Sequence, residues 1–301
     1  MSISTLLAIA SSKENFNTLD DYIAFCLRYL DFSTNGLQAT IVSQNEPNYC
    51  FYQYRKDGQH NITRPINSSL MYPAAGADSI KNEFPRILDD VADLSPEDEN
   101  ARAVLQRAIY TIQQSIGATL DALPSGKSNT ARKINGDLFE RLMRLILVRI
   151  GMDCRSGTVR IPVLVNGKPE FEMTYQHDLL LFRESQLKII GSVKTSSKDR
   201  LDKIFIDKFL YSRLTETDIP HIAIFLNDVQ RKRTRKENQF GINPTFLPGH
   251  FKGYSVKLNP LDGVYYCDIR PNMSTDEFLK QHIKTIDCLL CDDLAGFMGK
   301  K

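Results

Sequence analysis

The spacing of hydrophobic and polar residues changes character near residue 129. Ahead of that point, apolar residues recur at helical intervals over residues 18–30, and a mixed segment through Tyr54 favours short strands. Residues 78–123 return to helical spacing, although Pro85 weakens the first helix and Pro96 separates it from the second. We therefore predict a mainly helical first part.

The segment PSGKSN, residues 124–129, has the composition of a loop and is the best candidate for a boundary. It divides the chain into an N-terminal region, 1–128, and a second part, 129–301. A helix is predicted to begin near Asn135, which offers a cap, and to end at Gly151.

After this helix the period shortens to that of strands, with Asn166-Gly167 as a strong hairpin turn. The predicted order is strands at 159–165, 170–175, 178–182 and 187–193, a helix at 199–214 and a strand at 221–226. Strands joined in hairpins and followed by a helix and another strand predict an α/β fold, with a central mixed sheet flanked by helices.

Composition sets the broad class. A chain of 301 residues that is 42% hydrophobic can bury a large core, and it has no apolar run long enough to cross a bilayer. Its N-terminal apolar patch has no basic residue ahead of it, so we expect no secretory signal and a cytoplasmic location. Six scattered cysteines indicate reduced thiols. Cys288 and Cys291 form a lone C-x-x-C motif, for which core packing is favoured over metal or redox chemistry.

The overall charge is nearly balanced, with 38 Lys and Arg against 36 Asp and Glu, a net charge of +2. Net charge therefore does not announce a nucleic-acid partner, and any DNA contact must come from a local patch. Acidic residues elsewhere in the chain can hide such a patch in the sum.

Asp178 opens one predicted strand and Ser192-Val193-Lys194 ends the next, so a hairpin brings this carboxylate and this ammonium to one edge of the sheet. Phosphodiester hydrolysis can use such a pair. A carboxylate can hold a hard cation that polarises the phosphate, while a lysine orients or deprotonates the attacking water.

This arrangement resembles the PD-(D/E)xK nucleases, whose second acid normally stands two residues before the lysine, where this chain has Ser192. It looks like the restriction enzymes that recognise CCGG or CCNGG, in which the following helix supplies the missing acid. That resemblance gives Asp207 the second metal-binding role. It covers roughly residues 135–226, and His177 stands where the family's proline would precede Asp178.

The residues after Lys194 extend the resemblance, since Lys198, Asp199 and Arg200 look like the family's recognition segment. Their chemistry suits adjacent G·C pairs, because the basic side chains donate to guanine O6 and N7 and the carboxylate accepts from cytosine N4. Joining this segment to Lys194 would let correct base contacts align the catalytic group.

Two of the predicted catalytic acids can also be interpreted as surface residues with no catalytic role. Glu140 resembles an additional acid that this superfamily places near its metal site, but with Arg141 and Arg144 it also fits a charged helix face. Asp207 lies four residues after Lys203, which is typical of a solvated face with ion pairs. Asp202 competes with Asp207 for the metal-binding role.

Other polar features of the sequence are weaker indications of function. The basic run at residues 231–236 suits phosphate contact but is also typical of an exposed loop, and Arg132 and Lys133 have the same standing. His177 adjoins Asp178, yet a lone histidine is no evidence of catalysis.

The resemblance implies a type II restriction endonuclease with a restriction-endonuclease-like core, in which Asp178, Lys194, Asp207 and Glu140 are catalytic. It implies Mg²⁺ bound by Asp178 and Asp207, double-stranded DNA as the partner, no membrane association, and a homodimer that reads a palindrome. Two alternatives stay open: a less specific repair or recombination nuclease, and a DNA-binding protein with an inactive nuclease core.

Overall fold

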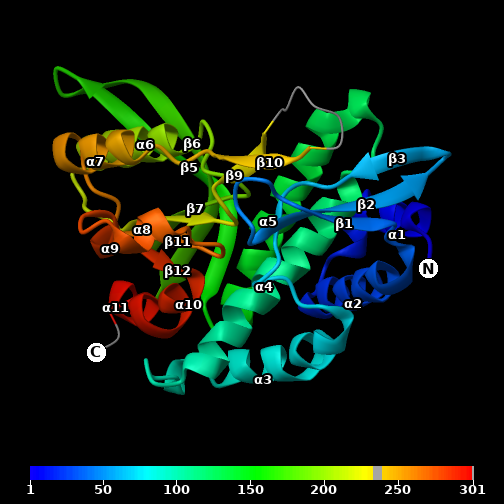
Figure 1. Cartoon of the computed structure of the whole chain (residues 1–301). Helices are drawn as coiled ribbons and strands as arrows, with labels where there is room; N and C mark the ends of the chain where they lie inside the picture. Colours follow the sequence, from blue (N-terminus) through cyan, green and yellow to red (C-terminus); the bar gives the residue numbers. More distant parts are fainter. Residues whose placement is uncertain (233–238, 300–301) are drawn as a thin grey trace.

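The computed structural model describes residues 1–232 and 239–299, and its centre is a mixed six-stranded sheet with helices on both faces (Figure 1). The strand order is β12-β11-β8-β7-β6-β5. The bounds are β5 Asp153–Val165, β6 Lys168–Arg183, β7 Gln186–Lys194, β8 His221–Phe225, β11 Gly263–Tyr266 and β12 Ile283–Thr285. Strands β5, β6 and β7 pair antiparallel, whereas β7, β8, β11 and β12 pair parallel. The predicted α/β class with a central mixed sheet is confirmed.

Alternation along the strands sends neighbouring side chains to opposite faces of this sheet. Leu179, Leu181 and Val193 join the core beneath helices α4 (Glu99–Leu120) and α5 (Ser128–Arg149). Leu180 and Ile190 instead pack with Tyr211 of helix α6 (Leu201–Thr215). Helix α7 (Pro248–Lys257) lies beside α6, where Phe205 meets Phe251. Both faces of the sheet are therefore covered.

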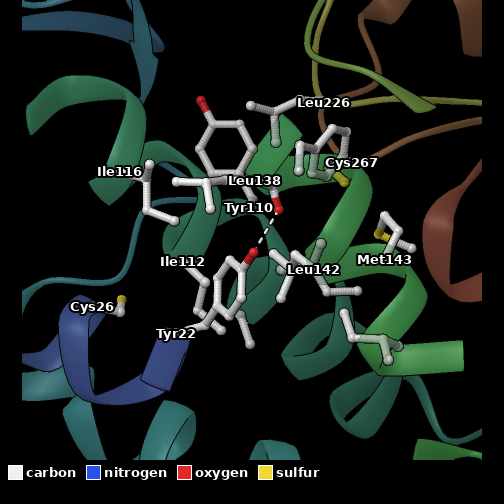
Figure 2. Close-up of a cluster of buried hydrophobic side chains, with 14 of the residues drawn as sticks. Tyr22, Cys26, Tyr110, Ile112, Ile116, Leu138, Leu142, Met143, Leu226 and Cys267 are labelled. Carbon is white, nitrogen blue, oxygen red and sulfur yellow. Dashed lines mark hydrogen bonds between the residues drawn. The ribbon is translucent and has the colours of Figure 1, made fainter. Parts of the chain in front are cut away.

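Helix α4 is the centre of the larger core, and its second half is buried on every side. Figure 2 shows side chains from α2 (Leu19–Gly36), α4 and α5 meeting Leu226 and Cys267 from the ends of β8 and β11. Tyr22 donates a 2.8 Å hydrogen bond to the carbonyl of Leu138, which satisfies its buried hydroxyl. The N-terminal region is thus packed directly onto the α5 side of the sheet.

The N-terminal region combines helices with a small sheet. Its elements are α1 Ile3–Ala10, α2, α3 Phe84–Asp89 and strands β1 Ala39–Val42, β2 Tyr49–Lys56, β3 Gln59–Ile62 and β4 Ile66–Asn67. A second hairpin, β9 (Val229–Lys232) and β10 (Gly241–Pro244), docks on this sheet. Gln44 N–H donates to the carbonyl of Phe240 at 3.0 Å, and the Asn45 amide binds both backbone groups of Ile242.

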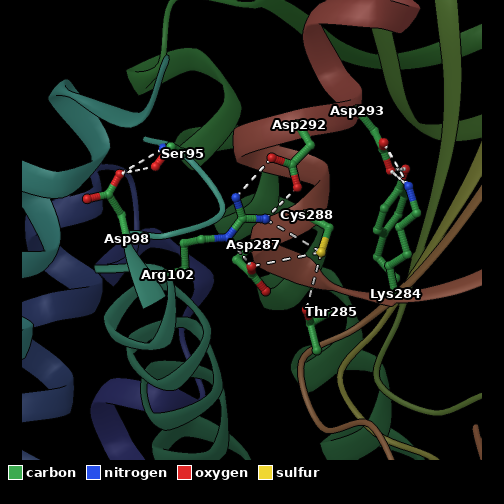
Figure 3. Close-up of polar contacts among 10 residues, drawn as sticks. Ser95, Asp98, Arg102, Lys284, Thr285, Asp287, Cys288, Asp292 and Asp293 are labelled. Atoms are coloured by element: carbon green, nitrogen blue, oxygen red, sulfur yellow. Dashed lines mark hydrogen bonds and ion pairs between the residues drawn. The ribbon is translucent and has the colours of Figure 1, made fainter. Parts of the chain in front are cut away.

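The C-terminal segment is tied to α4 by Arg102, whose guanidinium donates to Asp287 at 2.9 Å and also to Asp292 (Figure 3). Short helices α8 (Pro271–Thr275), α9 (Leu279–His282), α10 (Ile286–Cys288) and α11 (Leu294–Phe297) make up most of this segment. Cys288 and Cys291 are half-buried free thiols packed against the larger core, as expected. Over residues 1–232 and 239–299, no helix is long and apolar enough to span a membrane.

Three element boundaries were predicted wrongly, the first being the start of β5, which is Asp153 rather than residue 159. Helix α5 begins at Ser128 rather than near Asn135, because Asn135 is buried inside the helix, where its side chain and carbonyl both accept from Gln113. The two strands predicted at 170–175 and 178–182 are one continuous strand, β6. The turn at Asn166-Gly167 is confirmed by positive φ at both residues. The larger core runs through both parts of the chain, and the boundary at residue 128 stays a prediction.

Candidate active site

Asp178 and Lys194 meet where β6 and β7 separate. The ladder between these strands begins at Leu179 and Gly191, and the Asp178 carboxylate accepts the Val193 N–H at 2.8 Å. The Lys194 ammonium donates to the same Oδ2 atom at 2.5 Å. One carboxylate oxygen therefore both closes the end of the ladder and binds the lysine.

Glu140, on helix α5, completes the group from the neighbouring layer. Its Oε1 accepts from Lys194 Nζ at 3.0 Å, so the ammonium bridges two carboxylates that come from different elements. All three side chains keep partial access to solvent, with 28% of Lys194, 31% of Glu140 and 15% of Asp178 exposed. We call these three residues the Lys194 cluster. Glu140 and Asp178 lie far apart in the sequence, and the packing of helix α5 brings their side chains to the same lysine.

Electrostatics in the cluster favour a positive charge between its two carboxylates. Burial and then the Asp178 charge raise the pKa of Glu140, with Lys194 opposing them. Burial lowers the pKa of Lys194, but the two carboxylates outweigh it and the net pKa is raised. The lysine is therefore held as an ammonium between two acids, and the acids repel one another wherever positive charge is lacking.

His177 has no part in this cluster. It points to the opposite face of the sheet, where it is buried against Tyr175, Tyr211 and His221. Burial, followed by repulsion from His221, lowers the pKa of His177 to about 4. The neutral ring is a packing residue beneath α6, in keeping with its exclusion from the predicted site.

The predicted recognition residues Lys198, Asp199 and Arg200 are all exposed, in the turn between Lys194 and helix α6. Asp199 takes positive φ, 52°, and so turns the chain into the helix, which begins one residue later than Arg200. The Lys198 ammonium donates to Gln230 Oε1 on β9 at 3.1 Å. The triplet is thus offered to solvent close to the Lys194 cluster.

A hydroxyl network fixes the start of this turn. Thr245 Oγ1 lies 3.3 Å from Ser196 Oγ and 3.1 Å from Ser197 Oγ, and it donates to the carbonyl of Asp228 at 2.8 Å. Sequence reasoning missed Thr245 and Gln230. No local pattern marks them, because only the β9–β10 hairpin carries them to the turn.

Asp207 stands apart from the Lys194 cluster. It is half-buried on α6, its Oδ2 lies 3.8 Å from Lys203 Nζ, and its charge acts on Tyr175. Burial raises the pKa of Asp207, and Lys203 opposes the shift. Asp202 is exposed on the first turn of α6. The structure thus gathers Glu140, Asp178 and Lys194, while Asp207 approaches the sheet from its α6 side.

The donor chemistry of the cluster fits magnesium. Asp178 and Glu140 supply hard carboxylate oxygens, and each has one oxygen that makes no hydrogen bond within the described residues. Among the described residues, no three or more His, Cys, Asp or Glu side chains already stand in a metal-binding group. The residues that fit the ion are Asp178 and Glu140, with Asp207 as the predicted third donor.

The other predicted basic residues lie at the surface. Arg132 and Lys133 are exposed on the first turns of α5. Arg231 donates to the Ile62 carbonyl at 3.4 Å, and Lys232 is exposed on β9. Residues 233–236 of the basic run lie outside the described residues.

Comparison with known proteins supports the fold. The crystal structure of the type IIP restriction endonuclease Kpn2I aligns with a TM-score of 0.71, covering 99% of this chain and 98% of that one, at 16% sequence identity. The complex of the restriction endonuclease PspGI with its substrate DNA aligns with a TM-score of 0.44 over 74% of this chain and 93% of that one, at 13% identity. No family model matches the sequence, and no curated protein matches it. The chain therefore has the fold of restriction endonuclease Kpn2I over nearly its whole length.

Proposed function

We propose that this protein is a type II restriction endonuclease that cuts both strands of DNA at a palindrome containing CCGG or CCNGG. One observation carries the proposal: Lys194 bridges Asp178 and Glu140 at a partly exposed edge of a restriction-endonuclease-like sheet. The exposed triplet Lys198, Asp199 and Arg200 follows that lysine directly. Base reading and bond cleavage are thereby joined in one short segment.

In this proposal the three side chains of the Lys194 cluster and Asp207, which stands apart from the cluster on α6, have separate tasks. Asp178 and Asp207 would hold Mg²⁺, with Glu140 assisting them, and the ion would supply polarisation of the scissile phosphate. Lys194 orients the attacking water and stabilises charge that develops on the phosphate. Attack in line with the leaving 3′ oxygen gives a 3′-hydroxyl and a 5′-phosphate.

Recognition is assigned to the turn before α6. Lys198 and Arg200 donate to guanine, and Asp199 accepts from cytosine, in the major groove. Thr245 holds the serines of this turn, so the register of the triplet relative to Lys194 is fixed by the network around it. Two copies related by a two-fold axis read the two halves of a palindrome.

The test is digestion of a sequenced, unmethylated plasmid with and without Mg²⁺, followed by sequencing of every fragment end. We expect ends at a single motif that contains CCGG or CCNGG, and none with Lys194→Ala. Cutting without preference for sequence would indicate a repair or recombination nuclease. Specific binding without cutting would indicate a DNA-binding protein with an inactive core.

A further inference from the structure

The antiparallel strands β5 and β6 run well beyond the rest of the sheet (Figure 1, green hairpin). Strand β6 pairs with β7 only from Leu179 to Arg183, whereas residues 168–177 pair with β5 alone. We call residues 158–176 the arm. It leaves the sheet beside Asp178, and at about 3.3 Å per residue it reaches roughly 30 Å past the Lys194 cluster.

One face of the arm is apolar along its length. The register sets Val159, Ile161 and Val163 opposite Tyr175, Met173 and Phe171. Near the sheet this face is covered, since Ile161 and Tyr175 are buried with Tyr211 of α6. At the end of the arm the cover stops: on this face Phe171 is 55% exposed and Val165 48%, and on the other face Leu164 is 59% exposed. Three large apolar side chains within eight residues are thus left in water, where a two-stranded ribbon alone is only marginally stable.

We propose that the end of the arm packs against the arm of a second copy of this chain, across the DNA that both copies hold. This inference rests on the proposed function, which requires a second catalytic centre for the second strand. Because the arm leaves the sheet at the catalytic edge, its end extends toward the place where that second copy must sit. A two-fold axis sets like surfaces against each other, and an apolar end meets its own apolar end.

The charges on the arm favour a protein over DNA as the partner that its end contacts. Residues 158–176 carry Arg160 and Lys168 against Glu170 and Glu172, a balanced set, whereas a DNA-binding arm needs excess positive charge. In a two-fold contact, Lys168 of one copy can face Glu170 of the other. Pro162 interrupts the free edge of β5, so packing of side chains is favoured over addition of a strand.

The contact is small. Three such side chains bury a few hundred Å², below the roughly 1,200 Å² of stable interfaces. We therefore expect the arms to associate weakly in the free protein and firmly on DNA, where one duplex raises the effective concentration of the second copy.

The first experiment is cross-linking of the full chain through Asn166→Cys at the tip of the arm. We expect a covalent dimer on a duplex that carries one recognition site. The unsubstituted chain reports any background from the native cysteines, and Ser125→Cys, in an exposed turn elsewhere, is the matched control. Failure of Asn166→Cys to exceed these controls would overturn the proposal.

The second experiment replaces Val165 and Phe171, which share one face of the arm, by Ser and measures the number of chains per duplex by sedimentation. We expect about tenfold fewer two-chain complexes and the accumulation of singly nicked DNA. Val256→Ser, at an apolar residue 64% exposed on α7, is expected to behave as wild type. Wild-type assembly and double-strand cutting by the arm variant, or weaker binding of a single chain to DNA, would overturn the proposal.

Failure of the proposed nuclease function and failure of the arm proposal give different results. If the protein is no nuclease, wild type does not cut the duplex, whether or not it binds it, and cross-linking of the concentrated free protein still reports arm pairing. If only the arm proposal is wrong, wild type cuts both strands and the arm variant matches it.

Discussion

Two groups of acidic residues lie on this fold, and they differ in how their charges are satisfied. In the Lys194 cluster, Asp178 and Glu140 share an ammonium and keep partial contact with solvent. Asp228 and Asp268, which follow β8 and β11, are both fully buried near Arg270. We call these three residues the Arg270 cluster. Both groups combine carboxylates with a cation, yet only the first can admit a substrate.

The Arg270 cluster joins the N-terminal region to the sheet. Asp268 accepts from Tyr49 at 2.9 Å and Asn67 at 2.8 Å, both of the small N-terminal sheet. Burial raises the pKa of Asp228 to about 7 and that of Asp268 to about 6. A perturbed carboxyl group is therefore no sign of a functional site by itself, and accessibility separates the reactive cluster from the structural one.

The largest expected effect is on the rate of DNA cleavage, and it distinguishes the Lys194 cluster from the Arg270 cluster. Lys194→Ala should lower the single-turnover rate of DNA cleavage by about 10³-fold, because no other cation among the residues that the structure describes binds both carboxylates. The rate is normalised to folded protein, because loss of the ammonium leaves the Asp178 and Glu140 carboxylates repelling one another. Lys188→Ala, on the same strand, is the matched control and should cut normally. An active Lys194→Ala protein would remove this lysine from the mechanism.

Substitutions in the Arg270 cluster should instead lower the stability of the folded protein. Asp268→Ala leaves the buried Tyr49 hydroxyl and Asn67 amide without an acceptor, which should lower the free energy of unfolding by about 3 kcal/mol. Asp268→Asn retains an acceptor oxygen and should lose less. Urea unfolding of the two variants measures both values. Equal unfolding midpoints for wild type and Asp268→Ala would contradict the structural role.

A third comparison decides between two acids of α6. Asp207→Asn should lower the rate at saturating DNA by about 10²-fold, since a half-buried carboxylate facing the sheet is proposed to hold the metal ion. Asp202→Asn, exposed on the same helix, should leave the rate unchanged. The opposite result would assign the metal-binding role to Asp202.

The pH dependence of folding should expose the buried His177. Its pKa of about 4, against 6.5 in the unfolded chain, means that protonation opposes folding. The stability it provides is complete above pH 6.5 and is lost as the pH falls toward 4, by about 2 kcal/mol at pH 5. The raised pKa of Asp228 acts in the opposite sense over this range, so wild type alone shows only the sum.

His177→Phe isolates the histidine contribution. The difference in unfolding free energy between wild type and this variant should change by about 2 kcal/mol from pH 7 to pH 5. A difference that does not vary with pH would mean that His177 titrates normally in the folded protein.

The smallest effect concerns the turn that carries the recognition residues. Thr245→Val removes the hydroxyl shared by Ser196 and Ser197, and discrimination against sites with one altered base pair should fall by about tenfold. Thr245→Ser keeps the hydroxyl and should restore discrimination. Competition cleavage of cognate and altered duplexes measures the ratio. A specificity defect that Ser does not repair would show that packing of the Thr methyl matters instead.

Local patterns in the sequence predicted strands β5 to β8, with β6 divided into two, the hairpin turn and helix α6, because period and turn chemistry are short-range properties. The start of α5 was misjudged because Asn135, a good cap in isolation, is held inside the helix by Gln113. Asp178 and Lys194 were predictable as a pair, since one hairpin joins them. Glu140 entered only through resemblance, and its contact with Lys194 depends on how α5 packs.

Contacts between residues distant in the sequence could not be predicted from local patterns. Gln230 and Thr245 reach the recognition turn only because β9 and β10 pair and dock on the small N-terminal sheet. The burial of Asp228 and Asp268 likewise depends on that docking. Residues whose role arises from contacts distant in sequence carry no local signal.

The most direct test of the account compares Asp178→Asn with Asp268→Asn in single-turnover cleavage of a duplex that carries the recognition site, with rates normalised to folded protein. We predict that Asp178→Asn cuts about 10³-fold more slowly at unchanged stability, while Asp268→Asn cuts at the wild-type rate once its folded fraction is counted. A normal rate for Asp178→Asn, or an equal loss in both, would contradict the assignment of the Lys194 cluster as the catalytic centre.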